Sequence, residues 1–178
     1  MTQPGQNPKT KIILTRRDKI YLLLIFASLC LTVWAIAIYN LTIIDIKYLF
    51  AAAAVGGIIV FALILLLHKS SYRVIWTFII SIAIGGGFSC FGLLFLNKLF
   101  AGSPQTKEFE IVSTGHLGRV SNGNCFKPYA VIDFDGIQKQ LVFTCEDEKA
   151  IKSYHKVAVT FSKGLFGFGV IRSKQLAQ

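Results

Sequence analysis

Three long apolar runs occupy most of the first 100 residues of this 178-residue chain, and they constrain its fold more than any other feature. The runs are Ile20–Ile44, Tyr48–Leu67 and Val74–Leu96, and none of them contains a charged side chain. A helix needs about 20 mainly apolar residues to cross the hydrocarbon core of a bilayer, and each run reaches that length. The sequence therefore predicts three transmembrane helices, over about 20–42, 48–67 and 74–96.

Basic side chains flank these runs unevenly and predict the orientation of the chain. The tail 1–19 contains five lysines and arginines, the loop 45–47 contains one, and the loop 68–73 contains two. Because Lys and Arg concentrate in loops that stay in the cytoplasm, this order favours a cytoplasmic tail in the cell (inner) membrane. Three crossings then place the C-terminal domain on the periplasmic or extracellular side.

The distribution of charge along the chain also indicates which partners to expect. The formal net charge is +10, but most of the excess lies in the membrane flanks and not in a basic stripe on the C-terminal part. We therefore expect the lipid bilayer as a partner and do not expect nucleic acid. No Asp, Glu, Lys, Arg or His lies inside a run, which argues against a self-contained pump or proton-coupled transporter.

Small residues recur at four-residue spacing in the second and third runs. Ala52 and Gly56 share one helix face, and Ser81, Gly85 and Ser89 share another. Such faces let two helix backbones approach closely in a membrane. Packing of the second helix on the third within one chain is one interpretation, and docking of a partner subunit is the other. The triplet 85–87 is also compatible with a kink or a cavity lining.

The remaining residues indicate a small β domain behind a short linker. Ala101-Gly102-Ser103-Pro104 ends the third helix and predicts a linker over 101–106. Alternating apolar segments then predict five or six short strands within 107–178, with one short helix over Thr144–Tyr154. The expected fold class is a membrane bundle of three helices plus a small all-β, SH3-like or OB-like barrel.

One hairpin of this domain can be placed by residue number. Asp135-Gly136 separates two alternating segments, and Asp-Gly is a strong signal for a two-residue type I′ turn. Such a turn pairs Phe134 with Ile137 and Ala130 with Leu141 on one apolar face. The sequence therefore predicts both the turn and the register of this hairpin.

The layout of residues 107–176 resembles the β domain of small bacterial membrane proteins. The resemblance is carried by Gly118-Arg119-Val120, by Pro128-Tyr129-Ala130-Val131-Ile132-Asp133-Phe134-Asp135-Gly136, and by Tyr154 followed by Lys156-Val157-Ala158-Val159. More loosely, the architecture is similar to short NfeD-type proteins, in which several spans precede an OB barrel. The resemblance implies a scaffold or assembly role in a membrane and supplies no catalytic residues.

The cysteines of the β domain allow two interpretations. Cys125 and Cys145 flank the predicted hairpin, each ten residues from Asp135, and an extracytoplasmic location would let them form a disulfide. A strict two-residue turn places them on opposite faces and favours two free thiols instead. Zinc binding by these cysteines with His116 and His155 is disfavoured because the spacing matches no compact zinc motif. We therefore expect no metal, no cofactor and no catalytic residues.

Two aromatic residues stand in a glycine-rich turn near the C-terminus. Phe166 and Phe168 alternate with Gly164, Gly167 and Gly169, so they have little local core to enter. They are candidates for contact with the bilayer surface or a partner. The function predicted from the sequence is a non-enzymatic accessory or assembly subunit whose β domain contacts a protein partner. The alternative is a homo-oligomeric, channel-like or translocation component whose copies line a path through the glycine-rich third helix.

Overall fold

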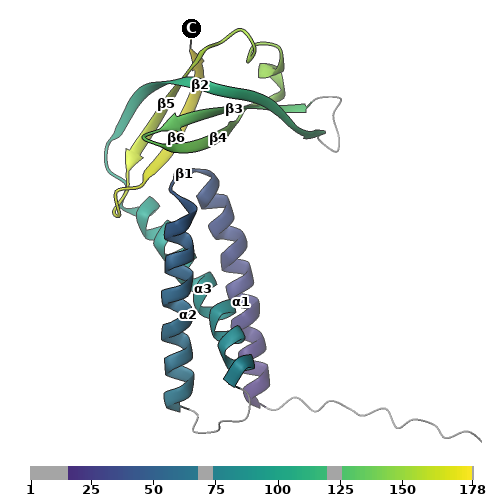
Figure 1. Cartoon of the computed structure of the whole chain (residues 1–178), viewed down its shortest axis with the longest axis vertical. Helices are drawn as coiled ribbons and strands as arrows, with labels where there is room; N and C mark the ends of the chain where they lie inside the picture. The colour runs from purple at the N-terminus through teal and green to yellow at the C-terminus, as the bar shows by residue number, and fades with distance from the viewer. Residues whose placement is uncertain (1–15, 68–73, 120–125, 178) are drawn as a thin grey trace, which may run out of the picture.

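The computed structural model describes residues 16–67, 74–119 and 126–177, which form a three-helix bundle with a β domain at one end (Figure 1). The helices are α1 (Arg16–Asn40), α2 (Ile46–Leu67) and α3 (Val74–Leu99). All three are long and apolar enough to cross a membrane. The predicted class of multi-pass membrane protein with a small barrel-like β domain is confirmed.

Helix α3 packs against both other helices, and the glycine triplet lies at both contacts. A Cβ atom on Gly85 would lie 2.3 Å from the Gly56 carbonyl oxygen of α2. A Cβ atom on Gly87 would lie 2.1 Å from the Ser28 hydroxyl oxygen of α1. The triplet therefore sits within an unbroken helix and allows two neighbouring backbones to approach α3.

Six antiparallel strands form the sheet, in the order β1-β6-β5-β2-β3-β4. The strands are β1 (Thr42–Ile43), β2 (Pro104–Arg119), β3 (Phe126–Phe134), β4 (Ile137–Val142), β5 (Lys156–Lys163) and β6 (Gly169–Ala177). The sheet curls into a nearly closed barrel, so β1 and β4 are its two edge strands. A short 3-10 helix, η1 (Cys145–Glu148), and turns occupy the segment where the sequence predicts one short helix.

Strand β1 does not come from the C-terminal part of the chain. It lies in the connection between α1 and α2, where the sequence predicts the end of the first apolar run. Thr42 pairs with Val170 and Ile43 with Gly169 of β6. The Ile43 side chain is only 3% exposed and belongs to the core of the barrel. The first interhelical connection and the β domain therefore lie at the same end of the bundle, as three crossings require.

The predicted hairpin is confirmed in turn and register. Phe134 pairs with Ile137 and Ala130 with Leu141. Asp135 and Gly136 have φ values of +52° and +85°, as a type I′ turn requires at both central positions. The Gly136 amide also donates to the Asp133 carboxylate at 2.7 Å, which further fixes the turn.

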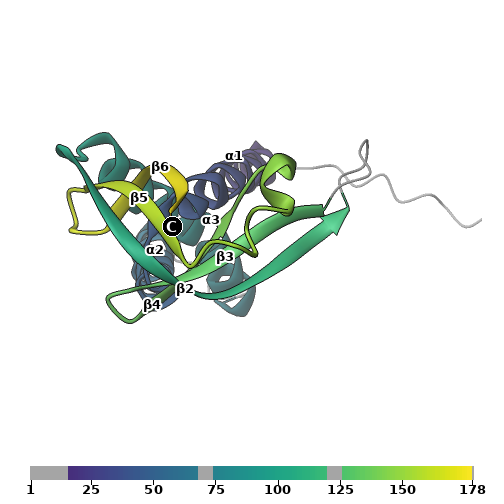
Figure 2. The same cartoon turned by 90° about the horizontal axis from the view of Figure 1, so that it is seen from above.

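Strands β2 and β3 are longer than the barrel needs and form an arm. Strand β2 begins at Pro104, inside the segment expected as a linker, and runs unbroken to Arg119. Proline is tolerated there because the first residue of a strand need not donate to the ladder. The far end of the β2–β3 pair extends beyond the helix bundle both in side view (Figure 1) and from above (Figure 2). We call this pair the β2–β3 arm.

Candidate functional site at the junction of bundle and barrel

Two lysines join the edges of the sheet where backbone pairing ends. Lys174 on β6 donates to the Val142 carbonyl on edge strand β4. Lys139 on β4 donates at 2.8 Å to the Thr42 carbonyl on edge strand β1. The barrel is thus joined across its open seam by one lysine of edge strand β4 and one lysine of β6, the neighbour of edge strand β1, and burial lowers the pKa of the Lys174 ammonium.

Lys139 also attaches the barrel to the end of helix α1. Its ammonium donates at 2.9 Å to the Tyr39 carbonyl and lies 4.5 Å from the centre of the Tyr39 ring. The carbonyls at a helix C-terminus carry partial negative charge and favour a cation. Lys139 is nevertheless only 8% exposed, and this burial lowers its pKa to about 8. The side chain is therefore a partly desolvated cation held by two backbone acceptors.

Asn97 makes a second attachment, between the last turn of α3 and the β5–β6 loop. Its amide nitrogen donates to the Phe168 carbonyl at 3.2 Å, and its amide oxygen accepts from the Phe166 amide at 3.0 Å. The side chain is fully buried, so the Asn97 end of each bond is shielded from water. A Cβ atom on Gly164 would lie 2.4 Å from the Asn97 amide, so the loop needs a glycine at this contact.

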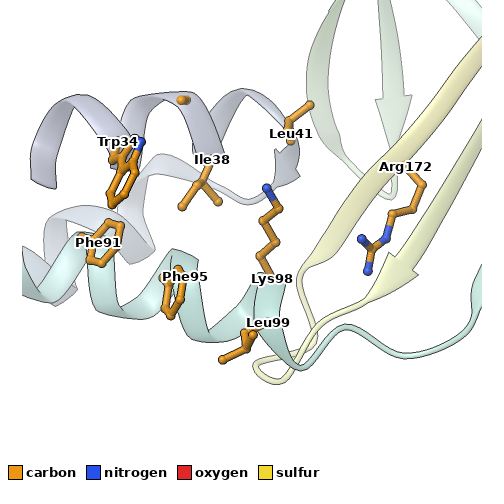
Figure 3. Close-up of a pocket in the computed structure, with 9 residues that line it drawn as sticks. Trp34, Ile38, Leu41, Phe91, Phe95, Lys98, Leu99 and Arg172 are labelled. Carbon is orange, nitrogen blue, oxygen red and sulfur yellow. The ribbon is translucent and has the colours of Figure 1, made fainter.

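A cavity of 540 Å³ lies beside these attachments, between α1, α3 and β6. Its apolar wall includes Trp34, Phe91 and Phe95, whose rings stack in sequence with centroids 6.0 Å and 5.3 Å apart. At the end nearest the barrel, Lys98 of α3 and Arg172 of β6 line it (Figure 3). We call it the aromatic cavity. Among the described residues, its lining contains two basic side chains and no acidic side chain.

A second cavity, of 560 Å³, lies over the lysine-joined seam. It is lined by Tyr39 and Asn40 of α1, by β4, by Leu117 of the arm, and by Ile171 and Lys174 of β6. This seam cleft is more polar than the aromatic cavity, because glutamine and lysine side chains form much of its wall. Its two lysines already donate hydrogen bonds to backbone carbonyls. We therefore interpret the seam cleft as part of the contact between barrel and bundle, which we call the joint.

The predicted small-residue face lies between α2 and α3. A Cβ atom on Gly56 would lie 1.9 Å from the Ser89 hydroxyl and 2.5 Å from the Gly85 carbonyl oxygen. Ser81 is fully buried and donates to the Thr77 carbonyl one turn earlier at 2.6 Å. Ala52, on the same helix as Gly56, is half-buried. These contacts within the chain agree with the first of the two sequence interpretations.

Only one of the two cysteines of the β domain lies among the described residues. Cys145 opens η1 after β4 has ended at Val142, so the register of the hairpin no longer determines where its side chain points. Cys145 is disulfide-bonded. Its predicted partner, Cys125, lies outside the described residues, so the pairing stays a prediction. In the described segments, no three His, Cys, Asp or Glu side chains gather closely enough to share a metal ion.

The two aromatic residues of the β5–β6 loop have different environments. Phe168 packs against a cluster that includes Ile44 and Leu94, and its ring lies 5.3 Å from that of Tyr48. The Phe168 side chain is therefore packed within the chain, in contrast to the predicted contact with the bilayer or a partner. Phe166 is 46% exposed near the end of α3, and contact with the bilayer or a partner stays a prediction for it.

Sequence reasoning missed the residues that join bundle and barrel. One signal was present for Lys139, because strand alternation places it on the same face as Ile137 and Leu141, where a charge is unexpected. Asn97 was similarly a polar residue next to a long apolar run. Comparison with known proteins finds no matching family model, no matching curated protein and no matching solved structure. The function of this chain therefore has to be inferred from its own contacts.

Proposed function

We propose that this membrane protein is a non-enzymatic accessory or assembly subunit whose β domain contacts a protein partner outside the cytoplasm. Three attachments support a fixed orientation of that domain on the bundle: pairing of β1 with β6, the Lys139 bonds and the Asn97 bonds. Buried bonds of this kind favour one arrangement over a swinging domain. A domain held in this way presents the same surface to a neighbour in the membrane at all times.

The observation that carries the proposal is the apolar surface of the β2–β3 arm. The pairing of β2 with β3 skips Val112, which leaves this residue in a bulge with 55% of its surface exposed. Phe126 and Leu117 are 43% and 39% exposed further along the arm. Bulges often re-aim a side chain at a functional surface, and aromatic residues such as phenylalanine are enriched at protein interfaces. The arm therefore suits contact with another protein.

The channel-like alternative gains no comparable support. It requires copies of the chain to line a path with the glycine-rich part of α3. Gly85 and Gly86 face α2, and Gly87 faces α1, so these positions are occupied by contacts within one chain. Gly92 has open space beside it, but a single glycine does not make a path.

Site-specific photo-crosslinking in intact membranes tests the partner. A photoreactive residue at Val112 should give one discrete adduct with another protein, whereas the same residue at Ile79, 50% exposed on α3, should not. Val112→Asp should reduce recovery of that partner about tenfold without lowering the unfolding temperature, since it places a charge in an apolar contact. The absence of adducts at Val112, Leu117 and Phe126 would contradict the proposal. An adduct between two copies of this chain would favour the alternative.

The orientation is tested separately. A reporter enzyme that is active only outside the cytoplasm should be active when fused after Gln178, because the basic tail favours a cytoplasmic N-terminus. The same reporter inserted at Asn40, beside β1, should also be active. A silent C-terminal fusion with an active fusion in the loop 68–73 would invert the orientation and move the proposed partner to the cytoplasm.

A further inference from the structure

The aromatic cavity combines an apolar wall with a basic end. A free anion would need only the basic end, and an apolar molecule would need only the wall. Its walls are Trp34, Ile38, Phe91, Phe95 and Leu99, all on segments that are candidate membrane spans. Its end nearest the barrel has the cations Lys98 and Arg172. An amphipathic ligand with a negative head matches this arrangement, with its chain along the aromatic wall and its head at the barrel.

The cavity is open to the surroundings of the helices. Trp34 is 66% exposed and Leu99 is 59% exposed, so the wall can be reached from the bilayer without opening the bundle. A lipid tail entering here would cover apolar surface that the chain leaves uncovered. Apolar surface buried in this way is favourable, and aromatic rings contribute much of it.

Both basic side chains also have hydrogen-bond donors left for a ligand. The Arg172 side chain makes one hydrogen bond to the described residues, from Nε to the Ser162 hydroxyl at 3.4 Å, which leaves its terminal nitrogens for a phosphate. The Lys98 ammonium makes no hydrogen bond or ion pair with any of the described residues, whereas its backbone carbonyl accepts from the Ala101 amide. Guanidinium and ammonium groups are the common partners of phosphate oxygens, and no carboxylate lines the cavity to compete for them.

We propose that the aromatic cavity binds one anionic phospholipid, with its phosphate between Lys98 and Arg172 and an acyl chain along Trp34, Phe91 and Phe95. The ligand class follows from charge complementarity at the head and from the position of the wall at membrane depth. The site is independent of the proposed partner of the β2–β3 arm, because none of the described residues that line the aromatic cavity belongs to that arm.

Native mass spectrometry of the full chain in detergent tests the site, with phosphatidylglycerol and phosphatidylcholine of equal chain length as probes. The wild-type chain should bind one phosphatidylglycerol about tenfold more tightly than phosphatidylcholine. Lys98→Gln with Arg172→Gln should remove that preference, whereas Lys107→Gln, at an exposed position on β2, should preserve it. Arg172→Lys should preserve part of it. Equal affinity of the wild-type chain for the two lipids would overturn the proposal.

A steric variant tests the position of the acyl chain without altering charge. Ala37 lines the aromatic cavity, so Ala37→Phe should weaken binding of both lipids, whereas Ile36→Phe, on the neighbouring face of α1, should not. Glycerol phosphate, a head without a chain, should bind far more weakly than phosphatidylglycerol. If it binds equally well, the site is for a free anion and the lipid proposal fails. If a photoreactive residue at Trp34 captures a protein instead of lipid, the occupant is a partner helix and the proposal fails as well.

Discussion

Gly85→Ala is expected to destabilise the helix bundle severely, although it adds a single methyl group. The new Cβ atom would lie 2.3 Å from the carbonyl oxygen and 2.5 Å from the carbonyl carbon of Gly56. Both atoms belong to backbone, so neither can move aside by a rotamer change, and α2 must shift away from α3. Overpacking of this kind costs about 3 kcal/mol, and the shift would also disturb the neighbouring contact of Gly56 with Ser89.

The matched control lies on the same helix. A methyl group at Gly92 would have no neighbouring atom within 4 Å, so Gly92→Ala should be neutral or raise stability by up to about 1 kcal/mol through helix propensity. Unfolding of the purified chain in mild detergent by added denaturing detergent measures both variants. Equal stability of Gly85→Ala and Gly92→Ala would mean that the Gly56–Gly85 approach does not hold the bundle together.

Lys139→Met is expected to weaken the joint between barrel and bundle, in a way that depends on pH. The variant removes the donor from the Tyr39 and Thr42 carbonyls, which should cost about 1–2 kcal/mol at pH 7. The folded-state pKa of Lys139 is lowered from 10.5 to about 8. Between these values the unfolded chain binds one more proton than the folded chain, so wild-type stability rises with pH there. The difference in unfolding free energy between wild type and variant should therefore increase from pH 8 to 10.5.

Chemical unfolding of both proteins at several pH values measures that gap. The widening should reach about 1–2 kcal/mol, less than the full linkage value, because the ammonium is incompletely desolvated. Lys127→Met, at an exposed position on β3, should leave the pH dependence of the wild type unchanged. A gap that narrows with rising pH would show that the carbonyls and the Tyr39 ring favour the charged form more than burial disfavours it.

Features that depend on a few neighbouring residues could be predicted from the sequence. The Asp135-Gly136 turn is such a case, because two positive φ values and the register of β3 on β4 follow from one dipeptide. The three helices are another, since length and the absence of charge decide them. The approach of Gly56 to Gly85 was predicted as one of two interpretations, because spacing identifies a face but not the helix that covers it.

The joint and the aromatic cavity could not be predicted in this way. Thr42-Ile43 is apolar enough to read as the end of a span, and only its partner Val170, far along the chain, makes it a strand. Lys139 reaches the Tyr39 carbonyl across 100 residues of sequence, and Asn97 reaches Phe168 across 71. The cavity needs Arg172 of β6 beside Lys98 of α3. Such pairs are specified by the tertiary fold, and no local pattern in one sequence contains them.

The position of β1 has a consequence for how the protein is made. β6, the strand that pairs with β1, occupies Gly169–Ala177 and is synthesised after β1 and after all three helices. Ile43 can therefore take its place in the core of the barrel only once that strand has been made. The core of the barrel is thus completed by a residue that lies between the first two membrane-spanning helices in the sequence. A fragment cut from residue 101 onward would lack one strand and one core side chain, so we expect the isolated β domain to be less stable than the same domain in the full chain.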